Sequence, residues 1–200
     1  MGKTAIIIGA TGLTGGLLLQ GLLEDNRYQK IKLLSRNPCS IKHPKIEEHL
    51  IDLFELEKQQ HLFIADEVFC CIGTTKAKTP NEEQYLKIDY AIPATLAQLC
   101  KKMGIHTLLV ISALGANKNS KIFYNRTKGR MEEEVLRNKI KNTYILRPSL
   151  IGGIRNEKRL GEKMAKLFMS VLNPFLIGIF IFILLLLHLL ENHTHVHQLL

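Results

Sequence analysis

Short apolar runs alternate with longer amphipathic segments along most of the chain, and this alternation predicts the fold. A short apolar run bounded by polar or turn residues indicates a buried strand, whereas apolar residues three and four positions apart indicate a helix. Strands are predicted at residues 5–8, 31–35, 50–53, 67–72, 107–111 and 143–147. Helices are predicted at residues 13–24, just after 53, from about 80 to 103 and at about 124–138. Strands that alternate with helices favour right-handed crossovers, so we expect an α/β fold, a Rossmann-type doubly wound parallel sheet with helices on both faces.

A glycine-rich turn, GATGLTG, follows the first predicted strand. A strand, a glycine turn and a helix in this order bring bare backbone N–H groups and the positive end of a helix dipole to a diphosphate. The spacing is G-x-x-G-x-x-G rather than the commoner G-x-G-x-x-G, and a flexible loop is the competing interpretation. Its position between strand and helix favours a dinucleotide cradle. We assign cofactor binding here to Gly9, Thr11, Gly12, Leu13, Thr14 and Gly15.

The residues after the other strands are further candidates, because ligands of open α/β sheets bind beyond the carboxyl ends of the strands. Asp52 and Leu53, at the end of the third predicted strand, are expected to meet the adenine edge of the cofactor. Gly73, Thr74 and Thr75 follow the fourth predicted strand and are expected to pass under the ribose.

The end of the second predicted strand bears on the choice of coenzyme. In NAD-binding units an acidic residue about 20 positions past the glycines binds the ribose 2′-hydroxyl. Here the strand ends in Ser35 and Arg36. A guanidinium pairs bidentately with a 2′-phosphate, and Ser35 can donate a further hydrogen bond. We therefore expect NADP(H) to be preferred over NAD(H); the alternative is that Arg36 is an ordinary surface arginine.

Candidate catalytic residues follow the fifth predicted strand. Ser112 ends that strand, and Tyr124 and Lys128 lie four residues apart at the start of the next predicted helix, so they share one helix face. A neighbouring ammonium favours the phenolate, which lets tyrosine exchange a proton with a substrate oxygen near neutral pH. Ser112 can hydrogen-bond the same oxygen. A half-buried tyrosine beside a surface lysine is the competing interpretation.

Composition narrows the function classes. The chain carries 27 Lys and Arg against 18 Asp and Glu, a formal charge of +9, but the basic residues are scattered and no aromatic-studded basic stripe occurs. We therefore expect a solvated basic surface that attracts anionic cofactors, and no nucleic-acid partner. The cysteines show no metal-ligand spacing, which predicts reduced thiols, a cytoplasmic location and no metal site. They are Cys39, Cys70, Cys71 and Cys100.

The C-terminal segment has a different character from the rest. Residues 175–190 read FLIGIFIFILLLLHLL, sixteen residues where a membrane span usually needs about 20 and at least about 17. Lysines and arginines on the near side suit a C-terminal membrane anchor that keeps the enzyme on the cytoplasmic face. A buried element, or a tail foreign to the fold, is the alternative. We therefore divide the chain into a domain at 1–172 and a tail at 173–200, whose polar end, with His193, His195 and His197, is expected to fray rather than to bind metal.

Six sequence motifs occur together in this chain: GATGLTG, FCCIGTTKAK, LKIDY, VISALGA, YNRTK and RPSLIGGIRNEKRLGE. Jointly, over roughly residues 3–172, they resemble the short-chain dehydrogenase/reductase superfamily, in particular its atypical NmrA-like branch of Tat-interacting-protein-like oxidoreductases. The resemblance implies a Rossmann fold that binds NADPH, with a catalytic set of Ser112, Tyr124 and Lys128. It also implies that Arg147 and Pro148 border the nicotinamide. Asp89 stands where many relatives carry Asn, which argues against a proton-relay role for it.

Two functions follow as hypotheses. The first is an NADPH-dependent oxidoreductase that transfers hydride to a small carbonyl-type substrate, with Lys128 also fixing the ribose. The second is a non-catalytic NADP(H)-sensing protein of the NmrA-like type that recruits a protein partner. The presence of Ser112, Tyr124 and Lys128 together favours the enzyme, while the unusual tail favours the sensor.

Overall fold

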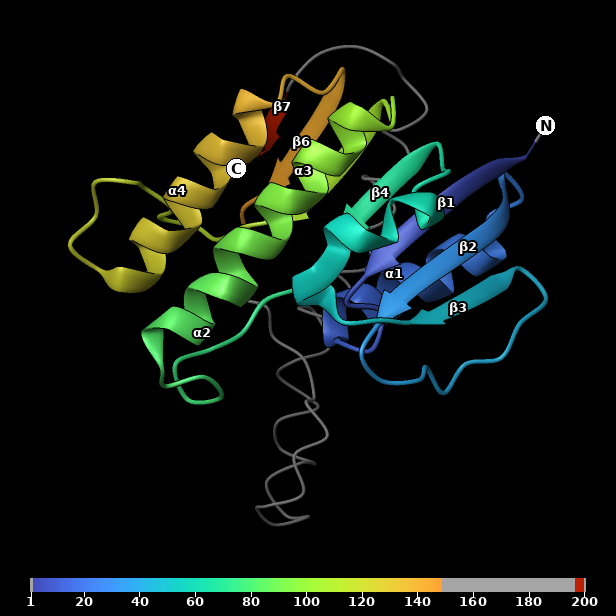
Figure 1. The fold of residues 1–200 in the computed structure, drawn as a ribbon, viewed down its shortest axis with the longest axis horizontal. Helices are drawn as coiled ribbons and strands as arrows, with labels where there is room; N and C mark the ends of the chain where they lie inside the picture. The colour runs from blue at the N-terminus through green and yellow to red at the C-terminus, as the bar shows by residue number, and fades with distance from the viewer. Residues whose placement is uncertain (1, 149–196, 200) are drawn as a thin grey trace, which may run out of the picture. The chain divides into compact units, whose positions relative to one another are not determined.

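The apolar runs pair into one parallel sheet (Figure 1). The computed structural model describes residues 2–148 and 197–199. Within them the strand order is β3-β2-β1-β4-β5-β6-β7, and every neighbouring pair is parallel. The order reverses between β1 and β4, which is the switch point where sheets of this kind bind ligands. The strands are β1 Lys3–Ile8, β2 Tyr28–Ser35, β3 Ile46–Leu50, β4 Glu67–Cys70, β5 Thr107–Ile111, β6 Asn142–Leu146 and β7 His197–Leu199.

Helices cover both faces of this sheet, as the sequence predicts. In Figure 1, α1 lies behind β1 and β2, while α3 crosses in front of β4 and β5. The helical segments are α1 Leu13–Glu24, the 3₁₀ segment η1 Leu53–Leu62, α2 Glu82–Leu86, the π-helical turn η2 Lys87–Ala91, α3 Ile92–Lys102 and α4 Phe123–Arg137. The predicted Rossmann-type fold is therefore confirmed.

The core follows from the two-residue period of the strands. Ile6 and Ile8 of β1 join a buried cluster with η1, α3 and α4, while Ala5 and Ile7, equally buried, belong to the opposite face with α1. A strand buried on both faces needs an unbroken apolar run, which is what residues 5–8 supply.

The third strand is predicted wrongly. The sequence predicts it at residues 50–53, but β3 is Ile46–Leu50 and Leu53 is instead a buried first residue of η1. β3 lies at the sheet edge and is partly solvated, so it needs no continuous apolar run. Other ends differ less: β2 begins at Tyr28 rather than residue 31, and β4 ends at Cys70 rather than residue 72.

The last described strand was not expected. The polar end of the chain is predicted to fray, yet His197–Leu199 forms β7 and pairs with β6, His197 opposite Tyr144 and Leu199 opposite Leu146. The predicted domain boundary at 172–173 and the apolar run 175–190 lie outside the described residues, as do His193 and His195. Among the residues that the structure describes, no helix is both long and apolar enough to cross a membrane.

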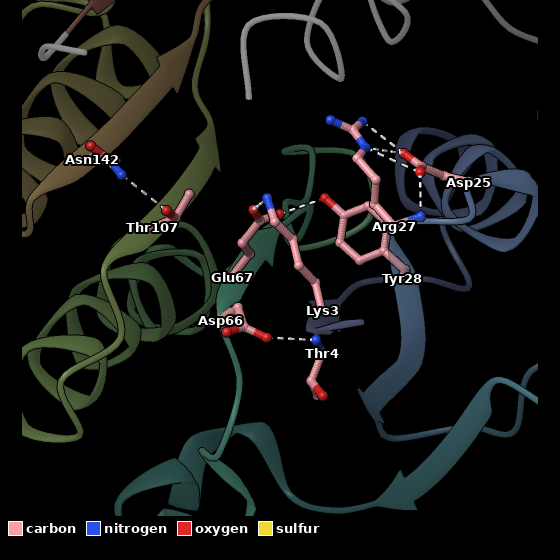
Figure 2. A network of polar contacts seen from close by, with 9 residues as sticks. All are labelled: Lys3, Thr4, Asp25, Arg27, Tyr28, Asp66, Glu67, Thr107 and Asn142. Atoms are coloured by element: carbon pink, nitrogen blue, oxygen red, sulfur yellow. Dashed lines mark hydrogen bonds and ion pairs between the residues drawn. The ribbon is translucent and has the colours of Figure 1, made fainter. Parts of the chain in front are cut away.

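A polar network fills the amino-terminal ends of the central strands (Figure 2). The Glu67 carboxylate, which begins β4, accepts hydrogen bonds from Lys3 Nζ at 2.7 Å and from the Tyr28 hydroxyl at 2.5 Å. Burial, together with the Glu67 charge, raises the pKa of the Tyr28 phenol. Further out, Asn142 Nδ2 donates to Thr107 Oγ1 at 3.2 Å. The buried Glu67 carboxylate at this end of the sheet is thus paired with the Lys3 ammonium and the Tyr28 hydroxyl.

Candidate functional site

The glycine turn joins β1 to α1 through two positions that exclude any side chain. Gly9 has φ +91°, and a Cβ there would lie 2.8 Å from the Cys71 carbonyl. A Cβ at Gly15 would lie only 2.1 Å from the Gly9 carbonyl oxygen. These glycines therefore let the turn pack tightly against the segment that follows β4 and against α1.

The amino terminus of α1 is open to solvent and chemically suited to an anion. Gly12 is the N-cap; within the described residues no side chain caps this helix end, and its first turn holds no acidic residue. Thr11 and Gly12 are exposed, while Leu13 and Thr14 are half-buried beside them. Unused N–H groups and the helix dipole attract negative charge. The residues present therefore fit a dinucleotide pyrophosphate.

The end of β2 places Arg36 and Ser35 in different roles. Arg36 is exposed, so its guanidinium faces solvent at the carboxyl end of the strand. Ser35 is buried, and its hydroxyl donates to the Asn37 carbonyl at 2.8 Å. The Ser35 proton is thus used within the turn, although its oxygen can still accept a hydrogen bond.

Asp52 and Leu53 lie beside this strand end but do not end a strand themselves. The Ile51 N–H donates to the Ser35 carbonyl at 2.9 Å, which brings the start of η1 to the carboxyl edge. The exposed Asp52 carboxylate accepts from the Phe54 N–H at 2.9 Å and so caps η1. Leu53 is 4% exposed and belongs to the core, so of the two only Asp52 reaches the edge with its side chain.

The turn after β4 is tied to the long helix that follows it. The Thr74 N–H donates to Asp89 Oδ2 at 2.7 Å, and the Tyr85 hydroxyl donates to the Thr74 carbonyl at 3.3 Å. Gly73 is exposed and Thr75 half-buried. Burial raises the pKa of Tyr85, and the nearby Asp89 and Tyr124 raise it further. The Tyr85 phenol therefore stays protonated and acts as a donor.

Two of the three candidate catalytic residues, Ser112 and Lys128, reach the end of β5. Ser112 is 3% exposed, and within the described residues its hydroxyl has no hydrogen-bond partner. Lys128 Nζ donates to the carbonyl of Ile111, the residue before Ser112, at 3.3 Å. Tyr124 is 39% exposed and lies one turn before Lys128 in α4, on the same helix face. A buried hydroxyl without a partner is unfavourable unless a ligand completes it.

Arg147 and Pro148 border the loop after β5 with their polar groups already engaged. The Arg147 guanidinium donates to both Glu132 oxygens, at 2.9 Å and 2.5 Å, and these bonds raise the pKa of Arg147. The Pro148 carbonyl accepts from the Leu114 N–H at 3.2 Å. Within the described residues Arg147 thus ties β6 to α4.

Sequence reasoning named Asp89 but gave it no role in the site. It is fully buried, accepts the Thr74 N–H and lies 2.8 Å from Lys128 Nζ. The signal was present, because Asp89 stands four residues after Tyr85 and seven before Leu96, within the buried stripe of the long helix. A carboxylate in such a stripe requires a partner.

No metal site emerges from the described part of the chain. No group of three or more His, Cys, Asp or Glu there could hold a metal ion. All four cysteines are free, and burial raises the pKa of Cys70 to about 12 and that of Cys100 to about 12. These two thiols are therefore protonated and unreactive at neutral pH.

Known proteins are similar to this chain in sequence and in fold. A protein family described as NAD(P)H-binding matches residues 9–158. The mitochondrial protein FMP52 of Debaryomyces hansenii is 31% identical over 159 residues, which is 78% of this chain and 70% of that protein. The protein HTATIP2 of Rattus norvegicus is 29% identical over 174 residues, 85% of this chain and 72% of that protein.

Two solved enzyme structures are similar to this chain in fold. The Bordetella bronchiseptica enzyme WbmG in complex with NAD has a TM-score of 0.61 at 12% identity, covering 74% of this chain and 53% of that one. The UDP-glucose 4-epimerase of Thermotoga maritima with UDP-glucose has a TM-score of 0.61 at 14% identity, covering 72% and 54%. This chain thus spans about half the length of those two enzymes. The match to the family over residues 9–158 and the FMP52 and HTATIP2 relatives show that the chain belongs to the NAD(P)H-binding family, as an atypical member of the short-chain dehydrogenase/reductase superfamily.

Proposed function

We propose that the chain is an NADP(H)-dependent oxidoreductase acting on a small carbonyl-type substrate. The observation that carries the proposal is the buried Ser112 hydroxyl without a partner in the described residues, next to the residue whose carbonyl Lys128 contacts. A donor held ready at the carboxyl end of β5, on the same edge of the sheet as the open terminus of α1, suits a substrate oxygen better than it suits the core.

Ser112, Tyr124 and Lys128 each have a separate role in the proposed reaction. A bound reduced nicotinamide supplies the hydride. Ser112 donates a hydrogen bond to the carbonyl oxygen, and Tyr124 gives that oxygen a proton. Lys128 Nζ donates a hydrogen bond to the Ile111 carbonyl and forms an ion pair with Asp89. An ammonium has three donors, so a further N–H is left to hold the ribose and to favour transfer from Tyr124.

The coenzyme preference rests on Arg36. Its exposed guanidinium stands at the carboxyl end of β2, and no acidic side chain precedes it at the strand end. A guanidinium fits the geometry of a phosphate group, and an acidic residue would repel one. These observations support NADP(H) over NAD(H).

The experiment that tests the proposal follows NADPH oxidation across a panel of small aldehydes and ketones. We expect turnover with at least one compound, and a loss of about 10²-fold or more in Tyr124→Phe because general acid help is removed. Calorimetry on the same variant should find NADPH affinity nearly unchanged. Tight NADPH binding with no turnover on any compound would favour instead a sensor that recruits a protein partner.

The compartment is a separate part of the proposal. We propose the cytoplasm, because the four free cysteines suit a reducing environment. The FMP52 relatives carry the word mitochondrial in their names. Fractionation of cells that express the tagged chain decides between the two, and carbonate extraction tests the anchor predicted at 175–190. Release into the soluble cytosolic fraction would support the cytoplasm and remove the anchor.

A further inference from the structure

A group of exposed lysines lacks the partners that most other lysines of the chain have. Within the described residues, no hydrogen bond or ion pair is made by the ammonium groups of Lys101, Lys102, Lys139 and Lys141. Among the other described lysines, Lys121 alone shares this property. Exposed lysines elsewhere pair with glutamate carboxylates at 2.6–2.9 Å; examples are Lys30, Lys58, Lys87 and Lys118.

The fold brings these lysines to one edge of the sheet. Lys101 and Lys102 are in the last turn of α3, and Lys139 and Lys141 follow α4. The two segments lead into β5 and β6, which pair in parallel from their first residues. Figure 1 shows α3 and α4 ending at the same end of the sheet, where β6 begins. The lysines therefore share the amino-terminal edge of β5 and β6, which we name the basic edge.

Carboxylates near the basic edge are few or already paired. The sequence contains no Asp or Glu between Asp89 and Glu132, and none from residue 135 to 156. On the β4 side the edge is bordered by Asp66, whose carboxylate accepts the Thr4 N–H at 2.7 Å. The carboxylates of α4 pair with other cations: Glu132 with Arg147, Glu133 with Lys118 and Glu134 with Arg137. Grouped like charges repel one another, so the basic edge is unfavourable by itself and attracts an anion.

Lys139 has a backbone conformation that suits glycine better than lysine. Its φ is +50°, and no other non-glycine residue among those described has a positive φ. After α3 the chain instead uses Gly104, with φ +70°. The left-handed region is disfavoured for residues with a Cβ, and glycine or asparagine is usual where a helix ends in this way. Helix ending therefore does not explain a lysine at this position. The helix dipole favours Lys101 and Lys102 in the last turn of α3, but it falls off beyond the helix.

Exposed apolar side chains lie at the same end of the sheet. Met103, which follows the lysines of α3, is 38% exposed, and Ile64, before β4, is 69% exposed. The segments before β4 and β5 are neighbours, because Glu67 pairs with Thr107. Lysines with apolar side chains among them suit an anionic bilayer, since the headgroups meet the charges and the apolar groups enter the interface. An acidic peptide needs a groove or a free strand edge, and in the described structure β5 and β6 each pair on both sides.

We propose that the basic edge docks the protein on an anionic membrane surface, with its ammonium groups against phospholipid headgroups and with Met103 and Ile64 in the interfacial layer. The candidate cofactor site lies at the carboxyl ends of the strands, so it stays open to solvent while the basic edge is engaged. The contact is electrostatic and does not require the apolar run 175–190. Salt reverses such a contact, whereas it does not extract a membrane anchor. The proposal is independent of the proposed reaction.

Vesicle sedimentation with the full chain tests the proposal. One set of vesicles is phosphatidylcholine alone, and in the other about one third of the lipid is phosphatidylglycerol, which gives an anionic surface. We expect the wild type to bind the anionic vesicles about 10²-fold more tightly, and to be released as salt rises from about 0.1 M to about 1 M. Each lysine of the basic edge should contribute about fivefold. A variant with glutamine at all of them should therefore lose about 10²-fold or more.

Two controls separate docking from stability and from net charge. Lys139→Gly removes one ammonium and suits the left-handed backbone, so it should be at least as stable as the wild type and yet bind anionic vesicles about fivefold more weakly. The second control makes the same change in net charge by placing glutamine at lysines that already have a glutamate partner, and its affinity should stay within about threefold of the wild type. These lysines are Lys30, Lys58, Lys87 and Lys118. Denaturant unfolding compares the stability of every variant.

Each outcome supports or overturns the membrane contact. A large loss of affinity for anionic vesicles on substitution of the basic edge, with binding retained by the paired-lysine control, supports it. Equal binding of the wild type to both kinds of vesicle overturns it. So does a basic-edge variant that keeps the affinity of the wild type for anionic vesicles. If polyglutamate binds the wild type tightly while anionic vesicles do not, the basic edge recognises an acidic protein and the membrane proposal fails.

Discussion

The two ends of the sheet each bury a carboxylate beside a lysine, but only one end is complete. At the amino-terminal ends of the strands, Glu67 receives Lys3 and the Tyr28 hydroxyl (Figure 2). At the carboxyl ends, Asp89 accepts the Thr74 N–H and forms an ion pair with Lys128, yet Asp89 Oδ1 and the Ser112 hydroxyl have no hydrogen-bond partner in the described residues. The same type of ion pair therefore lies among fully hydrogen-bonded groups at one end of the sheet, and beside polar atoms without hydrogen-bond partners at the other. Substitutions at the two ends should accordingly affect different measurements.

The largest effect is expected in the glycine turn. Gly15→Ala places a Cβ 2.1 Å from the Gly9 carbonyl oxygen, so either the turn or α1 must move. We expect the free energy of unfolding to fall by about 3 kcal/mol and NADPH binding to be lost. Gly16→Ala is the matched control, because its Cβ would meet nothing closer than 3.4 Å and alanine favours a helix. Denaturant unfolding and calorimetry check both variants, and equal stability of the two would contradict the close packing described here.

The next effect distinguishes two arginines at opposite ends of β2. Arg36→Ala should weaken NADPH binding by about 10–100-fold through the loss of a charge-assisted hydrogen bond, and leave NADH binding unchanged. Arg27→Ala is the control, because Arg27 precedes β2 and pairs with Asp25. It should leave both affinities unchanged. Titrations with NADPH and NADH measure the preference; an Arg36→Ala variant that keeps it would make Arg36 an ordinary surface residue.

The smallest effect concerns pH at the amino-terminal ends. Tyr28 has a raised pKa in the folded state, so its contribution is full below the unfolded value near 10 and is lost as the pH rises above it. Between pH 8 and pH 11 this should remove about 1.4 kcal/mol of the free energy of unfolding. Tyr28→Phe should show that much less dependence on pH. Denaturant unfolding at the two pH values measures the slopes, and identical slopes would show that Tyr28 does not titrate differently on folding. NADPH affinity at pH 8 should be equal in both proteins.

Much of the fold could be predicted because the spacing of the apolar residues along the chain distinguishes buried strands from helices. The bounds of α1 and β5 agree with the predicted 13–24 and 107–111. β3 was missed because an edge strand can be polar, and β7 because its pairing with β6 joins residues far apart in sequence. Fold recognition thus succeeded where local pattern and burial agree.

The site was harder to predict, because function depends on which side chains meet through space. The sequence indicates the glycine turn and the strand ends, but it does not show that Ser35 bonds Asn37 or that Arg147 pairs with Glu132. It also places Asp89 only by analogy with an asparagine, whereas the structure gives it two partners from distant elements. Partners of this kind follow from the assembled sheet rather than from spacing along the chain.

The π-helical turn at Lys87–Ala91 allows the long helix to lose one residue at this point without rotating its ends. A π-helical turn holds about one residue more than a regular turn, and each residue of an α-helix advances the chain by about 100° around the axis. Deleting a single residue from this turn would therefore restore regular helix and keep α2 in its orientation relative to α3. The same deletion within α3 would rotate α2 by about that angle and carry Tyr85 away from the Thr74 carbonyl. Homologous sequences that are one residue shorter are accordingly expected to lack that residue at this turn rather than in α3.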